Sequence, residues 1–295
     1  MPLMSKTDSC AQNLAMPAPI IESGVSAALS EDLGLIGDIT TNATIAANAT
    51  ATAAFVMRER GVVSGLEVAR AAFVALDQTC KFTSLANDGD VVNAGMAIAR
   101  VTGRARAILS GERVALNFLC RMSGIATLTR LYVDAISKTD ARIVDTRKTT
   151  PHLRAFEKYA VRCGGGHNHR TGLFDAMMIK DNHIVAAGGI EQAILRAREA
   201  AGHMISIEVE VDTLSQLEQV LAHVDKVDAV LLDNMSPGDL KRAVDRVAGR
   251  IICEASGGVS LDTVREIAKT GIDVISVGAL THSANTLDIG LDFTS

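Results

Sequence analysis

The second half of the sequence alternates short apolar runs with helical segments, and this alternation limits the possible folds more than any other feature. The apolar runs are rich in Val, Ile and Leu, and the segments between them repeat apolar residues at helical spacing. Repeated strand-then-helix units form parallel strands with right-handed crossovers, and continuous apolar strands are buried on both faces. The expected strands occupy residues 141–148, 177–180, 205–211, 228–234, 250–256 and 273–278.

Two α/β architectures fit this alternation, an open doubly wound sheet and a barrel. Reactive or small residues stand at the end of nearly every expected strand; they are Arg147, Lys148, Lys180, Glu210, Asp233, Ser256 and Gly278. A barrel gathers all its strand C-termini around one mouth, whereas an open sheet gathers only those beside its switch point. The sequence therefore favours an α/β barrel, which we assign to residues 113–285.

The first part of the chain has a different pattern. Short extended runs such as 51–60 and 96–109 alternate with a helical stretch at 66–76, which is typical of a small α+β domain. We expect this sandwich domain at residues 20–112, preceded by a flexible arm at residues 1–19.

Two further segments connect the expected domains. A long helical stretch begins near residue 111, and we expect an interruption at Ser123 and Gly124. The C-terminal residues 286–295 alternate apolar with polar or small side chains, as a half-buried strand does. We expect this strand to return to the N-terminal sheet.

Residues 145–170 concentrate positive charge in a chain whose net charge is −5. A nucleic-acid surface would combine a basic balance with aromatic stacking platforms, but this sequence is acidic and has no Trp and two Tyr. The segment therefore indicates a pocket for a small anion. Its cations are Arg147, Lys148, Arg154, Lys158, Arg162 and Arg170.

Cysteine spacing and hydropathy bear on the compartment. The five cysteines lie far apart and form no C-x-x-C pair, so the default is a reducing compartment. No signal peptide and no run of about 18 apolar residues is recognisable, and we expect no membrane span and a cytoplasmic location.

Residues 145–183, DTRKTTPHLRAFEKYAVRCGGGHNHRTGLFDAMMIKDNH, resemble the central signature of the quinolinate phosphoribosyltransferase family. The motifs EVEVD, LLDNMSP, EASGGVS and DVISVGALTHSA follow in that family's order. The resemblance runs from about Gly111 to Ala284, and more loosely over SEDLGLIGDITT and GERVALNFL.

The resemblance implies an activity and a fold. The family makes nicotinate mononucleotide from quinolinate and phosphoribosyl pyrophosphate, with Mg²⁺, and releases pyrophosphate and CO₂. Its members pair an N-terminal α/β sandwich with an incomplete α/β barrel, and homodimers share their active sites between subunits.

The resemblance also implies roles for the basic residues. It places Arg147, His169, Arg170 and Lys180 around the dicarboxylate of quinolinate. Arg113 would reach in from the neighbouring subunit, and Lys148 would hold phosphoribosyl pyrophosphate. The chemistry agrees, because adjacent carboxylates favour bidentate arginine donors over lysine.

Two strand-end carboxylates and a set of small residues complete the expected site. Glu208 and Glu210 share one face of a strand. Glu210, which is nearer the strand end, and Asp233 are candidates to bind the ribose hydroxyls. Glu208 is expected to form internal salt bridges. The sequence leaves open whether Mg²⁺ contacts Glu210 and Asp233 or only substrate oxygens. A 5-phosphate would lie in loops after the last two strands. The loop residues expected to hold it are Ser256, Gly257, Gly258 and Gly278.

The remaining histidines, glycines and cations of the basic segment give weaker signals. H-x-H alone is a weak zinc motif. His169 is instead expected to donate to a carboxylate or to a pyridine-ring neighbour. His167 is expected to be structural, and the role of His152 is undecided. Glycines 164–166 allow a tight bend or a close approach of the backbone. A second set of cations shares one face of an expected helix, and its role is either that of surface charges or of contacts at the rim of a phosphate site. The set comprises Arg154, Lys158 and Arg162.

Three alternatives remain open from the sequence. Lys180 could form a Schiff base, as in barrel aldolases. The chain could bind anions without catalysis, although the acidic strand ends would then have little use. It could also use nicotinate as acceptor. The pair Arg147 and Arg170 argues against this, because two arginines suit two carboxylates.

Overall fold

A computed structural model describes residues 15–294, which form two compact units. One unit comprises Met1–Arg130, Thr149–Gly165 and Thr281–Ser295, of which residues 1–14 and 295 are not described, and the other comprises Leu131–Lys148 and Gly166–Leu280. Most of the flexible arm that we expected at residues 1–19 lies outside the described residues; helix α1 (Ala18–Leu33) begins within that range.

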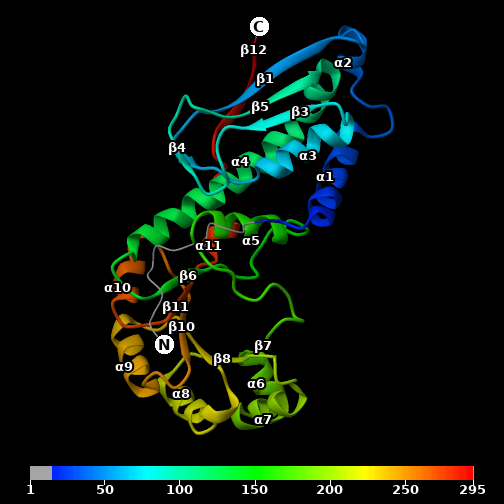
Figure 1. The fold of residues 1–295 in the computed structure, drawn as a ribbon. Coiled ribbons are helices and arrows are strands. Elements are labelled where there is room, and N and C mark those ends of the chain that lie inside the picture. The colour runs from blue at the N-terminus through cyan, green and yellow to red at the C-terminus, as the bar shows by residue number, and fades with distance from the viewer. Residues whose placement is uncertain (1–14, 295) are drawn as a thin grey trace. The chain divides into compact units, whose positions relative to one another are not determined.

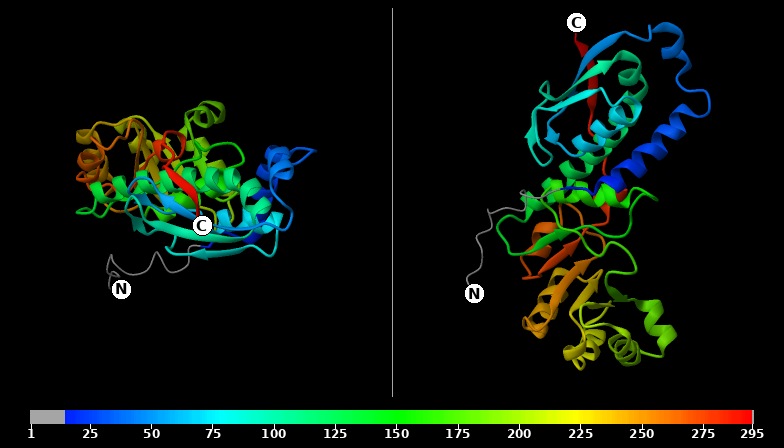
Figure 2. Two further views of the ribbon diagram at one scale, coloured as in Figure 1. Left: turned by 90° about the horizontal axis from the view of Figure 1, so that it is seen from above. Right: turned by 45° about the vertical axis from the view of Figure 1, so that its right-hand side comes forward.

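The first unit contains an antiparallel four-stranded sheet in the order β12-β1-β5-β3. Helices cover one face of the sheet (Figures 1 and 2). Between sheet and helices, the buried ring of Phe55 contacts the rings of Phe73 and Phe82, with centroids 6.0 and 5.9 Å away. The strands are β1 (Thr50–Met57), β3 (Lys81–Ser84), β5 (Ala97–Arg104) and β12 (Ile289–Thr294), and the main helices are α1, α3 (Leu66–Leu76) and α4 (Ala105–Ala135).

The C-terminal strand β12 pairs antiparallel with β1, with Leu291 opposite Phe55. The side chains of Leu287 and Ile289 are buried, as the alternation of apolar residues in the tail indicated, whereas Phe293 of the same alternation is 45% exposed. The shorter elements of this unit are α2 (Ile39–Thr44), β2 (Gly61–Val62), β4 (Val91–Val92) and α5 (Arg154–Cys163).

Helix α4 corrects two expectations. The extended run expected to continue to residue 109 ends at Arg104, where α4 begins, and α4 then continues for 31 residues without the interruption expected at Ser123 and Gly124. Tertiary packing explains why these residues are tolerated in a helix. The Ser123 hydroxyl accepts a hydrogen bond from the backbone N–H of Ser64 (3.0 Å), and a Cβ added to Gly124 would lie 1.9 Å from the backbone oxygen of Asn285.

Replacing Gly124 with alanine is expected to destabilise the protein by about 3 kcal/mol, because backbone rather than a movable side chain blocks the new methyl group. Urea unfolding would measure the loss. Gly111→Ala, in the same helix, is the control: its Cβ would meet the side chains of Phe73 and Leu76 at 3.1 to 3.3 Å, so its stability should stay within about 1 kcal/mol of the wild type. Equal losses for the two variants would contradict this account.

The boundary between the units differs from the division expected at residues 112 and 113, which falls inside α4. Residues 149–165 belong to the first unit, because buried polar contacts hold α5 there. The carboxylate of Glu157, 1% exposed, pairs with Arg121 of α4 at 2.8 Å, and the hydroxyl of Tyr159 donates to Asp88 at 2.7 Å.

The second unit contains six parallel strands in the order β6-β11-β10-β9-β8-β7 (Figure 1). This sheet confirms the expected α/β class, and β6 and β7 are its two edges among the described residues. Residues on both faces of β8 and β9 are buried, as the apolar runs indicated. The strands are β6 (Arg142–Val144), β7 (Met177–Ile179), β8 (Ile207–Val211), β9 (Ala229–Asp233), β10 (Ile252–Ser256) and β11 (Val274–Ser276).

Helices follow the strands, and local caps begin two of them. Thr213 caps α8 in a reciprocal capping box with Gln216, and Ser236 caps α9, whose first residue is Pro237. Such caps satisfy the backbone N–H groups where the chain turns from strand to helix. The helical elements are α6 (Asp181–Ala187), α7 (Ile190–Ala200), α8 (Leu214–Leu221), η2 (Val224–Lys226), α9 (Pro237–Val247), α10 (Val264–Ala268) and α11 (Ala279–His282). Among residues 15–294, no helix is long and apolar enough to cross a membrane.

Candidate active site

The carboxyl ends of the six parallel strands carry the residues that the sequence singled out. Because the strands are parallel, these ends lie along one edge of the sheet. In the order of the sheet, the residues at or just beyond the strand ends are Arg147 and Lys148 after β6, Gly278 after β11, Ser256 on β10, Asp233 on β9, Glu210 on β8 and Lys180 after β7.

Lys180 and Glu210 form an ion pair across the ends of neighbouring strands β7 and β8. The Glu210 side chain is 15% exposed and that of Lys180 is 43% exposed, so the pair lies where a ligand can reach its ammonium group. The backbone N–H of Lys180 donates to the ring of His183 (3.0 Å), which fixes the start of α6. The pair therefore places a cation and a carboxylate side by side at the sheet edge.

A buried aspartate holds the loop that presents His169 and Arg170. Asp145, fully buried just after β6, accepts hydrogen bonds from the backbone N–H of His169 (2.8 Å) and from the side chain of Asn168 (2.7 Å). The guanidinium of Arg170 donates to the backbone oxygen of Ala176 (3.1 Å). Sequence reasoning did not assign Asp145 a role, although its position beside Arg147 at a strand end was a signal.

Arg170 lies close to a second cation. Burial and then the charge of Arg147 lower the pKa of Arg170, while Glu208 and Asp175 act in the opposite direction. Two guanidinium groups that repel each other in a partly buried place favour a ligand with more than one negative charge. The structure thus brings Arg147, His169, Arg170 and Lys180 into one unit, on loops at the same sheet edge.

Two carboxylates converge on the ring of His169. Its Nε2 lies 3.1 Å from Glu208 and 3.5 Å from Glu254. Glu208 has an internal partner, as expected, but that partner is the ring of His169, which forms a salt bridge only when it is protonated. Glu254 was missed, although it lies two residues before Ser256 on the same face of β10. Burial, together with the charge of Glu208, raises the pKa of Glu254 to about 7.

The turns after β9 and β10 depend on each other. Asn234, at a left-handed φ of 54°, donates from its side chain to Asp233 (2.7 Å), and its backbone N–H donates to Ser256 (2.9 Å). A Cβ on Gly257 would lie 2.2 Å from the side-chain oxygen of Asn234, and Gly257 and Gly258 both have positive φ. Glycine is therefore required at Gly257 by geometry.

The other predicted residues lie elsewhere. Arg113 is exposed on α4, in the first unit. Of the cations on α5, Lys158 is buried, which contradicts the surface role considered for it. The guanidinium of Arg162 lies 5.5 Å from the ring centroid of Tyr159. Arg154 donates to Thr149 (2.9 Å).

The glycines and the remaining histidines of the basic segment shape the backbone. A Cβ on Gly164 would lie 2.5 Å from Ala126 of α4, so the glycine permits close packing of helices, and Gly165 has a φ of 88°. His167 forms a parallel bridge with Val144, and burial lowers the pKa of its ring, which agrees with a structural role. His152, exposed at a left-handed φ of 64°, has no role that this structure explains.

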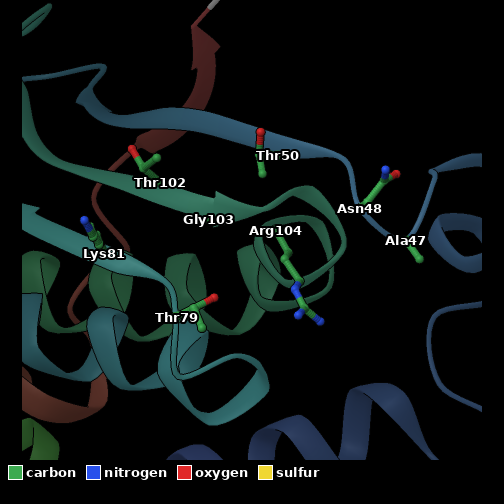
Figure 3. Close-up of a pocket in the computed structure, with 8 residues that line it drawn as sticks. All are labelled: Ala47, Asn48, Thr50, Thr79, Lys81, Thr102, Gly103 and Arg104. Atoms are coloured by element: carbon green, nitrogen blue, oxygen red, sulfur yellow. The ribbon is translucent and has the colours of Figure 1, made fainter.

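A hollow in the first unit holds none of these residues. Its volume is about 600 Å³, and Figure 3 shows it beside the ends of β1, β3 and β5. The head groups of Lys81 and Arg104 lie apart there, and Arg104 pairs with Asp77 at 3.4 Å. Without converging charged groups or a histidine, this hollow is not the candidate site.

The sequence matches known proteins over most of its length. The models for the N-terminal and C-terminal domains of quinolinate phosphoribosyl transferase match residues 38–123 and 125–292. A nicotinate-nucleotide pyrophosphorylase (carboxylating) of Mycobacterium leprae is 46% identical over 273 residues, which cover 90% of this chain and 94% of the relative. A probable enzyme of the same name from Bacillus subtilis is 44% identical over 264 residues, 90% of each protein.

A solved structure is similar over nearly the whole chain. The crystal structure of NadC from Streptococcus pyogenes superposes with a TM-score of 0.90 and 40% sequence identity, covering 95% of this chain and 99% of that one. Family models that together span both domains, relatives above 40% identity and a matching fold agree. The chain belongs to the quinolinate phosphoribosyltransferase family.

Proposed function

We propose that the chain transfers the phosphoribosyl group of phosphoribosyl pyrophosphate to quinolinate, with loss of CO₂, and so makes nicotinate mononucleotide for NAD biosynthesis. The observation that carries the proposal is that Arg147 and the partly buried Arg170, whose charges repel each other, follow strand ends at the sheet edge that also carries Lys180 and Glu210. Paired guanidinium groups suit the two adjacent carboxylates of quinolinate. The names of the relatives describe this reaction for those proteins.

The phosphoribosyl donor would occupy the other half of the sheet edge. Ser256, Gly257, Gly258 and Gly278 surround the 5-phosphate with backbone N–H groups, as small residues after the last strands of a barrel do. Glu210 and Asp233 hold the ribose hydroxyls, and Lys148 contacts the pyrophosphate. The support from this structure is the strained turn at Asn234 and Gly257, which keeps Asp233 beside Ser256.

The reaction then proceeds by positioning and electrostatics. The bond from the anomeric carbon to pyrophosphate breaks, and pyrophosphate leaves with the electron pair next to Lys148. The lone pair of the pyridine nitrogen forms the new bond to that carbon, with Arg147 and Arg170 holding the ring in line. The bond to the carboxylate next to the nitrogen breaks, CO₂ leaves, and the electron pair left on the ring carbon takes a proton. The cationic ring nitrogen stabilises that carbanion.

Magnesium is part of the proposal. The residues fit an ion that prefers oxygen donors. Glu210 and Asp233 supply carboxylates at adjacent strand ends; Lys180 contacts one oxygen of Glu210, and Asn234 donates to one oxygen of Asp233. Mg²⁺ prefers a few carboxylates together with substrate phosphate oxygens and water. When bound, it would neutralise charge on the leaving pyrophosphate.

A homodimer with a shared site also belongs to the proposal. Arg113 is exposed on α4, so a second copy can reach its guanidinium. Leu35, Ile36 and Ile39 are 105%, 80% and 67% exposed, and such an apolar patch is typical of a surface that a partner covers. We propose the cytoplasm as location, which the free thiols of the four described cysteines support.

A product assay tests the reaction against its alternatives. With quinolinate, phosphoribosyl pyrophosphate and Mg²⁺, we expect CO₂, pyrophosphate and nicotinate mononucleotide in equal amounts, and at least about 100-fold slower turnover with nicotinate. Turnover of nicotinate as fast as quinolinate would support a different acceptor, and binding without turnover would support an anion-binding protein. Borohydride should trap no adduct, because Lys180 is paired with Glu210 as an ammonium ion; a trapped adduct at Lys180 would support Schiff-base chemistry.

A further inference from the structure

His169 has partners within the chain at both ring nitrogens. Its Nδ1 accepts a hydrogen bond from the backbone N–H of Arg170 (2.7 Å), so the ring proton belongs on Nε2. That Nε2–H faces the carboxylates of Glu208 and Glu254, at 3.1 and 3.5 Å. The ring is therefore oriented by buried acids on one side and is attached to the backbone of Arg170 on the other.

The two carboxylates cannot both be ionised without strong repulsion. Glu208 is 9% exposed and Glu254 4%, and a carboxylate oxygen of each lies near the Nε2 of His169. One oxygen of Glu254, Oε1, is buried without a hydrogen-bond partner among the described residues, and burial followed by the charge of Glu208 raises the pKa of Glu254 to about 7. The groups that oppose this rise are His169, Ser276 on β11 and Lys180 after β7. Glu254 thus carries a proton below about pH 7, while Glu208 accepts the Nε2–H.

We propose that Glu208 and Glu254 are positioning residues for the dicarboxylate, which fix the ring of His169 and through it the backbone of Arg170. The inference rests on the proposed function, in which Arg170 binds quinolinate. It gives His169 a role different from direct donation to the substrate, because the ring N–H already faces Glu208.

A metal ion is the competing explanation of this cluster, since the ligand atoms of His169, Glu208 and Glu254 all lie within 4.8 Å of one another. An ion on Nε2 would have to replace the ring proton while Nδ1 still accepts the N–H of Arg170. The ring would then have lost both N–H protons and be an imidazolate. An ordinary histidine ligand is neutral, because its other ring nitrogen keeps a proton and donates it. Hydrogen bonding explains the cluster without that cost.

Kinetic constants for the two substrates test the positioning role. Glu208→Ala is expected to raise KM for quinolinate about tenfold and to leave KM for phosphoribosyl pyrophosphate within about twofold of wild type. Glu208→Gln should recover most of the loss, because the amide oxygen still accepts the Nε2–H. Equal changes in both KM values, or no recovery by glutamine, would overturn the inference.

The dependence of KM on pH tests the assignment of the proton to Glu254. As pH rises from about 6 to 8, Glu254 ionises beside Glu208, so wild-type KM for quinolinate should rise. Glu254→Gln mimics the protonated acid and should remove this rise. Ser276→Ala removes a hydrogen bond that favours ionised Glu254, so the rise should move to higher pH. A profile unchanged in both variants would contradict the proposal.

Two readouts separate this inference from the proposed function. The raised pKa means that folded Glu254 keeps a proton which the unfolded chain releases, so wild-type stability should fall relative to Glu254→Gln as pH rises from about 5 to 8. Thermal unfolding measures this without substrate. A stability difference between wild type and Glu254→Gln that stays constant with pH would overturn the assignment of the proton to Glu254. Titration with Zn²⁺ alone should show no binding that depends on Glu254. Zn²⁺ binding by the wild type that is lost in Glu254→Gln would support a metal site instead. Failure of wild-type turnover at every pH would instead reject the proposed reaction.

Discussion

Replacing Arg170 with alanine is expected to lower kcat/KM for quinolinate by about 10³-fold, the largest single effect that the site predicts. Arg170 is partly buried and close to Arg147, so its loss leaves a substrate carboxylate without its bidentate partner. KM for phosphoribosyl pyrophosphate should stay within about twofold, because we propose that this substrate binds at other strand ends. Steady-state kinetics with each substrate varied in turn would measure both values.

Two control variants make the Arg170 result specific. Arg170→Lys keeps the charge but loses the planar fork, and it should recover only part of the rate. Arg196→Ala removes an exposed arginine of α7, in the same unit, whose side chain donates to the backbone oxygen of Ala187 (3.3 Å). It should behave as wild type. Wild-type turnover by Arg170→Ala would remove the arginine from the site and contradict the proposed dicarboxylate pocket.

Mixed dimers give the second large effect. Arg113→Ala and Lys180→Ala are each expected to lose at least about 100-fold of the activity as homodimers, because each removes a cation from every site. In a shared-site dimer, one site of each hybrid receives both substitutions and the other receives neither. Random assortment makes half of the dimers hybrids, so mixing the two inactive proteins should restore about a quarter of the wild-type activity.

Refolding the two variants together from denaturant, followed by the product assay, measures this recovery. Lys148→Ala mixed with Lys180→Ala is the matched control, since both side chains lie in the second unit of one chain and every site in their hybrids keeps one defect. That mixture should stay inactive. If the Arg113 mixture also stayed inactive, the neighbouring-subunit arginine would have no place in the mechanism.

The strand-end residues could be predicted because each interrupts or follows an apolar run. Lys180, Glu210 and Asp233 stand where a buried parallel strand ends, and parallel strands put these ends along one edge. The β-then-α order therefore predicted both the sheet and the side of it that carries polar residues. Buried positions on β8 and β9 follow from the same runs.

The contacts that sequence reasoning missed depend on residues far apart in the chain. Glu254 is a single acid in an apolar run, and its partner His169 comes from a loop 85 positions earlier (254 − 169). Gly124 was expected to interrupt a helix, but the approach of Asn285 requires a residue without a Cβ. The periodicity of α5 placed its cations on one face, yet it could not show that Lys158 would be buried in the first unit. Local pattern carries no information on such tertiary partners.

A crystal structure of the protein with quinolinate, Mg²⁺ and an unreactive analogue of phosphoribosyl pyrophosphate tests the central claim most directly. The account predicts both ligands at the carboxyl edge of the six-stranded sheet, with the dicarboxylate on Arg147 and Arg170 and the 5-phosphate against the turn at Gly257. Quinolinate bound away from that edge, or the two ligands in separate sites with the pyridine nitrogen out of reach of the anomeric carbon, would contradict it.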